Sequence, residues 1–290
     1  MRLLSRASEA GERLAVLDGA GAAIDVADLL GDGPWTMGRL LTAAEPTLAA
    51  IRAALAGAQP RATRDPATIA LLPPVVRPGK IIAVGRNYRE HAAEEGRTVA
   101  PDPVLFTKFS TALIGDRANV VWRASDTAQV DYEAELAVVI GRTARDVPVE
   151  GALDHVLGYA CLDDISARDL QAGDGQWVRG KSLDTFCPFG PWLVTRDEIP
   201  DPGVLGIRCL VNGEIVQDAN TRDMVHGVPA LIAFCSRFMT LEPGDVIATG
   251  TPGGVGAFRQ PPRFLGDGDE VVVEIDGVGR LTNTCRIAEG

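Results

Sequence analysis

Long apolar runs and a surplus of basic residues are both absent from this chain of 290 residues. No stretch of about eighteen uninterrupted apolar residues occurs, so no membrane-spanning segment is expected. Basic residues number 28 against 39 acidic ones, which gives a net charge of −11. Because nucleic acids and anionic membranes require a basic surface, neither is expected as a partner. Hydrophobic residues still make up 46% of the chain, which is ample for a globular core.

Cysteine is also scarce, and no Cys-x-x-Cys pair occurs among the scattered positions Cys161, Cys187, Cys209, Cys235 and Cys285. An odd, dispersed set argues against a disulfide framework and against a zinc knuckle. Near the N-terminus, Glu9 and Glu12 interrupt the chain before the apolar region of a signal peptide could form. These features predict a cytoplasmic protein.

Several catalytic signatures are missing. The chain has no Gly-x-Ser-x-Gly, His-Glu-x-x-His or Gly-x-x-x-x-Gly-Lys-Ser/Thr motif, so the sequence does not support a serine hydrolase, a zincin or a P-loop enzyme. The glycine-rich segment at residues 249–256 does not match the dinucleotide-binding fingerprint. It is either a simple turn or a loop whose N–H groups and Thr251 hydroxyl hold a carboxylate or enolate oxygen.

The first 75 residues differ in character from the rest. We expect a strand at residues 13–17 and an alanine-rich helix at residues 46–55, followed by a run with several prolines. A boundary near residue 75 divides the chain into a small N-terminal α/β accessory domain, residues 1–75, and a catalytic domain, residues 76–290.

Beyond the boundary, strands outnumber helices. Apolar or alternating runs bounded by turn residues predict strands at residues 80–84, 104–109, 133–140, 192–194, 207–217, 245–248 and 270–275. Helical spacing predicts helices at residues 149–157 and 228–239. Asn212 and Gly213 predict a two-residue hairpin turn, since both tolerate positive φ. The fold class is therefore mainly β with some α.

Glu133 and Glu135 lie near the start of an otherwise apolar strand. Residues i and i+2 of a strand share a face, so the two carboxylates are expected to lie side by side. Their mutual repulsion is tolerable where a cation lies between them or where both face water. The spacing alone thus agrees with either a metal site or a solvated strand end.

A second acidic group, Asp163 and Asp164, ends another apolar run, and strand alternation sends only one of the two to the glutamate face. Three carboxylates without a nearby His or Cys suit a hard cation such as Mg²⁺ or Mn²⁺. Helix capping and exposed charge are the alternative for these aspartates.

His91 and Glu94 are three residues apart, and on one helical turn they would be neighbours able to hydrogen-bond. A carboxylate on one ring nitrogen raises the basicity of the other, as a general base requires. An ordinary surface pair is the alternative. Lys181 lies in an aromatic and glycine-rich setting, where a partly desolvated ammonium could stabilise an oxyanion.

Taken in order, these segments resemble the fumarylacetoacetate hydrolase (FAH) superfamily from about residue 79 to the C-terminus. The resemblance is carried by residues 80–88, His91, residues 103–108, the Glu133/Glu135 strand, residues 164–169, Lys181, residues 211–214 and residues 243–252. It implies a β-roll or barrel-like sandwich, a homodimer and one Mg²⁺ or Mn²⁺ per subunit. The stretch from Thr251 to Leu265 is most similar to FAH-domain-containing proteins and bacterial diketo-acid hydrolases.

The resemblance also implies roles for single residues. Glu133, Glu135 and Asp164 would be the metal ligands, His91 with Glu94 the water-activating pair, and Lys181 a catalytic donor. The remaining residues implied to bind substrate are Arg86, Tyr88, Arg168, Gln171, Gly250 and Thr251.

The activity implied is metal-dependent hydrolysis of a C–C bond in a 2,4-diketo acid such as an acylpyruvate or fumarylpyruvate. The same metal–enolate site could instead serve oxaloacetate tautomerisation or decarboxylation, or isomerisation of a 2-hydroxy-diene-dioate. A non-catalytic dicarboxylate-binding protein is a third possibility, and the presence of every implied ligand counts against it.

Overall fold

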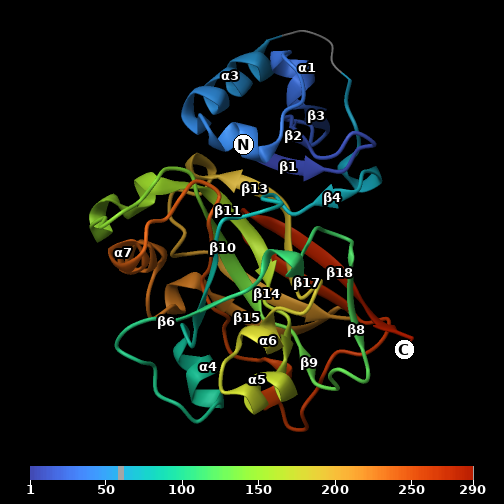
Figure 1. The fold of residues 1–290 in the computed structure, drawn as a ribbon, viewed down its shortest axis with the longest axis vertical. Coiled ribbons are helices and arrows are strands. Elements are labelled where there is room, and N and C mark those ends of the chain that lie inside the picture. The colour runs from blue at the N-terminus through green and yellow to red at the C-terminus, as the bar shows by residue number, and fades with distance from the viewer. Residues whose placement is uncertain (58–61, 290) are drawn as a thin grey trace.

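A computed structural model describes residues 1–57 and 62–289. Strands account for 34% of the chain and helices for 26%, which confirms the mainly β α+β class. The strands form two large sheets and one small one, and among the described residues they do not close into a barrel. The N-terminal segment lies at one end of the molecule, and α4, α5 and α6 lie at the other (Figure 1).

The larger sheet has eleven strands. Its main path runs β3-β2-β1-β13-β11-β10-β16-β5-β6, with β4 beside β1 and β7 beside β13. The strands are β1 Arg2–Arg6, β2 Arg13–Leu17, β3 Ala23–Asp25, β4 Leu71–Leu72, β5 Ile81–Gly85, β6 Val104–Thr107, β7 Leu113–Ile114, β10 Ala134–Ile140, β11 Val156–Asp163, β13 Cys187–Thr195 and β16 Val246–Ala248. The sheet thus places β10 and β11 side by side near its middle.

The second sheet has five strands in the order β15-β14-β17-β18-β8. They are β8 Asn119–Arg123, β14 Gly206–Val211, β15 Glu214–Asn220, β17 Glu270–Ile275 and β18 Gly279–Ala288. The small sheet pairs β9 Val130–Asp131 with β12 Ser166–Ala167. The predicted hairpin is confirmed, because Asn212 and Gly213 join β14 to β15 with φ of 53° and 81°.

Helices are short and lie around the sheets. They are α1 Val26–Leu30, α2 Met37–Leu41, α3 Ala44–Ala56, α4 Arg89–Glu94, α5 Arg168–Asp174, α6 Val178–Lys181 and α7 Val228–Phe238. Short 3-10 segments are η1 Pro66–Thr68, η2 Ser110–Ala112, η3 Val149–His155, η4 Arg196–Glu198, η5 Thr221–Asp223 and η6 Gly256–Phe258. Within the described ranges, no helix has the length and apolar character needed to cross a membrane.

The predicted helices at residues 46–55 and 228–239 are confirmed as α3 and α7. The helix predicted at residues 149–157 is wrong. Residues 149–155 form the 3-10 segment η3, and Val156 and Leu157 already belong to β11. The apolar residues there are divided between η3, where Ala152 is buried, and the start of β11, where Val156 lies opposite Ile140, so they do not form one α-helical face.

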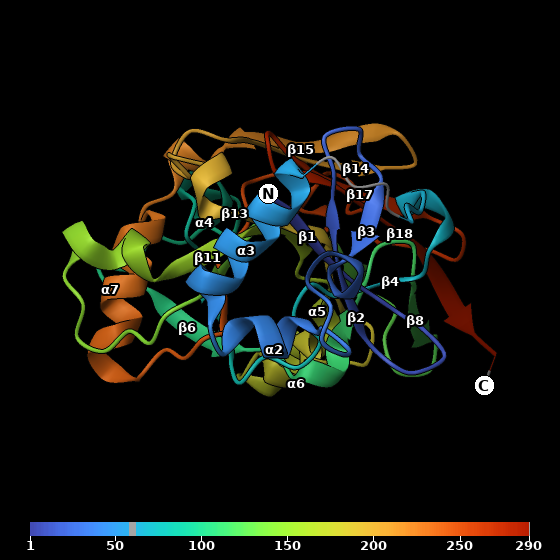
Figure 2. The same ribbon diagram turned by 90° about the horizontal axis from the view of Figure 1, so that it is seen from above.

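The N-terminal segment continues the large sheet. β1 pairs with β13 through Arg2 opposite Val194 and Leu3 opposite Leu193. Its side chains share a core with β10, since Leu3 and Val139 are both completely buried in one cluster. From above, α3 and β1 lie over the middle of the molecule, between α7 on one side and β8 on the other (Figure 2). The division at residue 75 stays a prediction from composition.

Strand β10 positions the acidic residues. Its residues from Leu136 to Ile140 are completely buried and apolar, with β11 and β16 on either side. A strand so enclosed has one available register, because a shift by one residue would exchange the two faces of the sheet. The carboxylates at its start are therefore held at a defined place.

Candidate active site

The three predicted metal ligands lie together. Glu133 precedes β10, Glu135 is in β10, and Asp164 follows β11. The antiparallel register places Ala134 opposite Asp163, and the Asp164 N–H donates to the Glu133 carbonyl at 2.9 Å. One carboxylate oxygen from each ligand lies within 4.8 Å of the others, and all three side chains are buried. Of the two adjacent aspartates, Asp164 therefore joins the glutamates.

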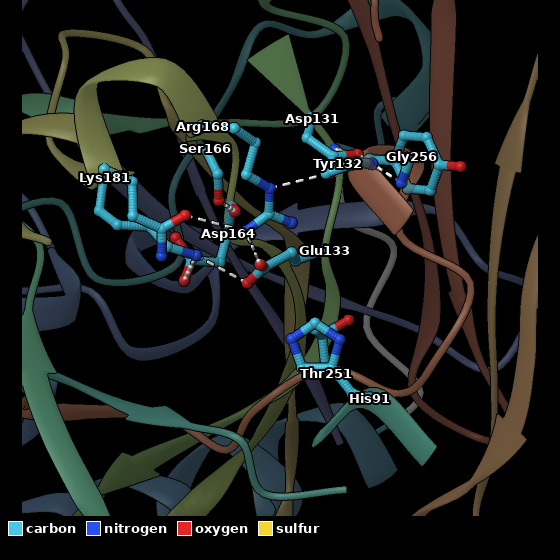
Figure 3. Close-up of polar contacts among 12 residues, drawn as sticks. His91, Asp131, Tyr132, Glu133, Asp164, Ser166, Arg168, Lys181, Thr251 and Gly256 are labelled. Atoms are coloured by element: carbon cyan, nitrogen blue, oxygen red, sulfur yellow. Dashed lines mark hydrogen bonds and ion pairs between the residues drawn. The ribbon is translucent and has the colours of Figure 1, made fainter. Parts of the chain in front are cut away.

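Two lysines lie against this cluster. The Lys181 ammonium donates to Glu133 Oε2 at 2.7 Å and to Asp164 Oδ2 at 2.8 Å. The Lys108 ammonium donates to the other oxygen, Asp164 Oδ1, at 2.5 Å. Burial alone would lower the pKa of Lys181, but Asp164 and Glu133 outweigh it and the pKa is raised. Lys181 is therefore charged, and its ammonium contacts both Glu133 and Asp164 (Figure 3).

Arg168, the first residue of α5, provides a third cation. Its Nε donates to Asp131 at 2.8 Å and one terminal nitrogen contacts Glu133 Oε1 at 2.7 Å. The same terminal nitrogen donates to Gln171 Oε1 at 3.1 Å. The other terminal nitrogen is buried and has no partner among the described residues. Because Arg168 lines the cavity beside the cluster, this free donor is available to a bound anion.

The cluster contains more acids than bases. Its buried acids are Asp131, Glu133, Glu135, Asp163 and Asp164, and its bases are Lys108, Arg168 and Lys181. The excess is two negative charges when all are ionised.

The pKa values show where this excess acts. Burial, then repulsion from Asp164 and Glu133, raises the pKa of Glu135 well above its usual range. Burial also raises the pKa of Glu133, but Lys181 and Arg168 outweigh it and leave that pKa well below normal. The pKa of Asp163 is raised to about 7, chiefly by burial. Without a cation, Glu135 is therefore the carboxyl of this group whose ionised form the surroundings disfavour most.

These residues fit a divalent cation. Carboxylate oxygens are the ligands that Mg²⁺ and Mn²⁺ prefer, and an ion of charge +2 would balance the excess. Glu133, Glu135 and Asp164 would hold it. The Gly250 N–H donates to Glu135 Oε2 at 2.8 Å, which fixes that side chain, and the other oxygen accepts no hydrogen bond from the described residues.

Helix α4 brings His91 to the cavity. The ring Nδ1 lies 3.7 Å from Glu94, too far for a hydrogen bond, and has no other partner in the described chain. The ring Nε2 lies 3.3 Å from Glu95. Glu94 instead accepts the Gly254 N–H at 2.8 Å. The expected His91–Glu94 hydrogen bond is therefore absent, and Glu95 is the nearer carboxylate.

Sequence reasoning missed Glu95, although its spacing of four residues from His91 is also a helical neighbour. It also missed Lys108 and Trp177. Trp177 packs so closely on Gly85 that an added Cβ would lie 2.4 Å from its ring, so only glycine fits there. The Arg86 guanidinium lies over the same ring, 4.9 Å from its centre, and donates to Glu95 at 2.7 Å.

The cavity between these side chains is small, with a volume of about 20 Å³. The predicted site residues that line it are Arg86, His91, Glu133, Glu135, Arg168, Gln171, Lys181 and Thr251. Those that do not are Tyr88, Glu94, Asp164 and Gly250. Trp177, Phe106 and Glu95 complete the polar and aromatic wall.

Tyr88 and Gly250, which do not line the cavity, lie close to it in the structure. Tyr88 is buried, its hydroxyl has no partner among the described residues, and burial followed by the charge of Glu135 raises its pKa. Gly250 shapes the loop before Thr251: its φ is +97°, and an added Cβ would lie 2.7 Å from Asn87. Its contribution to the site is a backbone donor.

Comparison with known proteins matches this arrangement to one family. The model described as fumarylacetoacetate (FAA) hydrolase C-terminal matches residues 80–286. The chain belongs to the fumarylacetoacetate hydrolase family. The predicted family is thus confirmed, and so is the general statement that the chain is an enzyme of this family with a metal-binding acidic triad.

The names of similar proteins describe more than one activity. Oxaloacetate tautomerase FAHD2A of Bos taurus is 44% identical over 94% of this chain and 87% of its own. Oxaloacetate tautomerase fahd2 of Xenopus laevis is 46% identical over 86% of this chain and 78% of its own. Both names carry the word mitochondrial.

A solved structure of maleylpyruvate hydrolase from Sphingobium sp., in complex with manganese (II) ion and pyruvate, is 39% identical and has a TM-score of 0.83. That similarity covers 100% of both chains. The relatives thus include both tautomerases and a hydrolase, and the bound manganese agrees with a divalent cation at the acidic triad.

Proposed function

We propose that this chain is a divalent-cation-dependent enzyme that forms and protonates the enolate of a small 2-oxo acid, with oxaloacetate tautomerisation as its main reaction. The observation that carries the proposal is the buried acidic triad beside Lys181, in a cluster that has two more acids than bases and borders a small cavity. The tautomerase relatives at 44–46% identity support the choice of substrate.

The chemistry divides between the cation and the chain. When bound, Mg²⁺ or Mn²⁺ would act as a Lewis acid on the 2-oxo acid group. The free terminal nitrogen of Arg168 would bind the substrate carboxylate. Lys181 would stabilise negative charge as it develops on the enolate oxygen.

Proton transfer falls to His91. His91 lines the cavity and its Nδ1 has no partner in the described residues, so this nitrogen is free to accept or donate a proton. The Nε2 contact with Glu95 at 3.3 Å would hold the ring. Keto and enol forms are isomers that differ in the place of one proton and one double bond, so a single group that moves a proton between oxygen and carbon suffices.

Hydrolysis of a 2,4-diketo acid is a second candidate. It is favoured by the maleylpyruvate hydrolase structure with manganese and pyruvate at 39% identity. In that reaction His91, assisted by Glu94 or Glu95, would deprotonate a water that attacks the distal carbonyl. Decarboxylation of oxaloacetate and isomerisation of a 2-hydroxy-diene-dioate would use the same enolate.

The test is turnover of enol-oxaloacetate, acetylpyruvate, fumarylpyruvate and a 2-hydroxy-diene-dioate, each with Mg²⁺, Mn²⁺ or EDTA. We expect rapid metal-dependent ketonisation of enol-oxaloacetate and much slower cleavage of the acylpyruvates. Rapid cleavage of an acylpyruvate without ketonisation would make the chain a hydrolase. No turnover of any of them would favour the binding protein.

His91→Ala tests the division of roles. Ketonisation should fall roughly a hundredfold or more, because the proton-transfer group is lost, and any acylpyruvate cleavage should be abolished. Mn²⁺ affinity, measured by calorimetry, should be unchanged, since His91 is not among the three ligands. Loss of Mn²⁺ binding in this variant would contradict the assignment.

Assembly and location remain predictions. We propose a homodimer, as the family resemblance implies, and a cytoplasmic location, which the scattered free cysteines favour. Light scattering on the purified chain tests the first, and cell fractionation tests the second.

A further inference from the structure

Gln217 is a buried polar side chain that connects the second sheet to the active site. It lies in β15, where Cys209 of β14 pairs with Gln217 and the next residue, Leu210, pairs with Ile215. Val216 is therefore an extra residue, a β-bulge. As a result Val216 and Gln217 are both buried, at 4% and 2% exposure, where a regular strand would send them to opposite faces.

The bulge directs the Gln217 amide between two backbone groups. Its Oε1 accepts from the Ala134 N–H at 2.9 Å, on the strand between the two glutamate ligands. Its Nε2 donates to the Pro252 carbonyl at 2.9 Å. An N–H can only donate and a carbonyl can only accept, so these partners determine which way the amide faces.

This orientation determines the role of Thr251. The second hydrogen of Gln217 Nε2 points to Thr251 Oγ1 at 2.9 Å, so the hydroxyl oxygen accepts there. The Thr251 hydroxyl then has its own hydrogen left over. Across residues 1–57 and 62–289, the structure has no hydrogen bond donated by the Thr251 hydroxyl. Thr251 is 3% exposed and lines the cavity with Glu133 and Lys181 (Figure 3).

We infer that Gln217 is a positioning residue that makes Thr251 a hydrogen-bond donor toward an acceptor-only group of the ligand, a carboxylate or enolate oxygen. The inference rests on the proposed function, because it takes an oxo acid as the occupant of the cavity. It deepens that function by assigning the polarity of one contact and by giving the second sheet a part in it.

Gln217→Glu exchanges a single NH₂ group for an oxygen. The variant keeps the acceptor for Ala134 but turns the donor to Thr251 into an acceptor, which draws the hydroxyl hydrogen away from the cavity. Thr251→Val removes the hydroxyl at nearly constant shape. Thr251→Ser keeps it. Thr249→Val is the matched control, since the Thr249 hydroxyl donates to the Leu136 carbonyl at 2.9 Å outside the cavity.

The measurement is oxalate binding to the Mn²⁺-loaded protein by calorimetry, with Mn²⁺ affinity and melting temperature determined for every variant. Gln217→Glu and Thr251→Val should each weaken oxalate roughly tenfold or more, as expected for a lost hydrogen bond to a charged group. Thr251→Ser and Thr249→Val should stay within about twofold of the wild type. In the Thr251→Val background, Gln217→Glu should add less than about threefold.

Two results would overturn the inference. Fully additive effects of Gln217→Glu and Thr251→Val would mean that the amide does not act through the hydroxyl. Unchanged oxalate affinity in Thr251→Val would mean that the hydroxyl is not a donor to the ligand, even if Gln217→Glu fails to fold. Because oxalate binding needs no turnover, failure of the proposed tautomerase activity is seen separately.

Discussion

Two groups of buried charge in this protein differ in their balance. In the N-terminal segment, Asp25 accepts from Arg6 Nε at 2.7 Å, and Arg64 lies 3.6 Å from the same carboxylate. Burial tends to raise the pKa of Asp25, but Arg6 and Arg64 outweigh it, so its pKa is below normal. Beside β10, by contrast, the pKa of Glu135 is raised well above its usual range by burial and by its acidic neighbours.

The difference separates a structural ion pair from a cation site. One carboxylate facing two arginines is neutralised by the chain itself, and an added cation would find no free negative charge. The cluster around Glu133, Glu135 and Asp164 leaves two charges unbalanced even with three cations in contact. A folded protein tolerates such a deficit where a bound ion supplies the missing charge.

The largest effect is expected from Glu135→Gln. Removing this carboxylate should weaken Mn²⁺ binding more than about a hundredfold and remove ketonisation, because the cation loses a ligand. In metal-free solution the same change should raise the free energy of unfolding by about 1–2 kcal/mol, since repulsion from Asp164 and Glu133 is relieved. Calorimetry and urea unfolding in EDTA measure the two effects. A destabilised metal-free variant would show that the cluster is balanced after all.

The next largest effect is expected at the ion pair of Asp25 with Arg6, whose charges the chain itself balances. Asp25→Asn should lower the free energy of unfolding by about 1–2 kcal/mol, because it leaves Arg6 partly buried without its carboxylate. Mn²⁺ affinity and ketonisation should be unchanged. An altered Mn²⁺ affinity would mean that the two groups of charge are not independent.

The smallest effect is a difference in pH dependence. A carboxyl group whose pKa is raised by folding stabilises the protein below its unfolded pKa, and that contribution is lost as the pH rises through the folded value. The values for Asp163 and Glu135 are raised, to about 7 for Asp163, so the metal-free wild type should lose stability between about pH 4 and pH 8.

The contribution of Asp25 to stability depends on pH in the opposite direction, because its lowered pKa gives stability that is lost only as the pH falls below the unfolded value.

Because the pKa of Glu135 is raised, the stabilising effect of Glu135→Gln should be greater at about pH 8 than at about pH 5.5. Urea unfolding of both proteins in EDTA measures it. An equal effect at both pH values would contradict the raised pKa of Glu135.

Local patterns were enough to predict much of the site. The two-residue spacing of Glu133 and Glu135 placed them on one face of a strand. The alternation of side chains along the next strand predicted that one of Asp163 and Asp164 would join them. The spacing of His91 suggested a helical neighbour, but Glu94 and Glu95 are both one turn away. Which of them approaches the ring depends on the loop at Gly254, which engages Glu94 from a distant part of the chain.

Features that depend on distant pairing could not be read from the sequence. Gln217 belongs to the site because of a bulge at Val216, and an alternating pattern does not show where a strand gains a residue. Strand β1 extends the large sheet through partners almost two hundred positions away, such as Leu193 opposite Leu3. At residues 149–157, an apolar spacing typical of an α-helix is shared between the 3-10 segment η3 and the first two residues of β11.

The central claim is that the unbalanced acidic cluster works by holding one divalent cation. Ketonisation of enol-oxaloacetate, followed by absorbance while Mn²⁺ is added to chelated protein, tests it most directly. We expect no acceleration by the chelated protein and a rate that rises in proportion to added Mn²⁺ until each chain holds one ion. Equal acceleration by the chelated protein, before any Mn²⁺ is added, would contradict it.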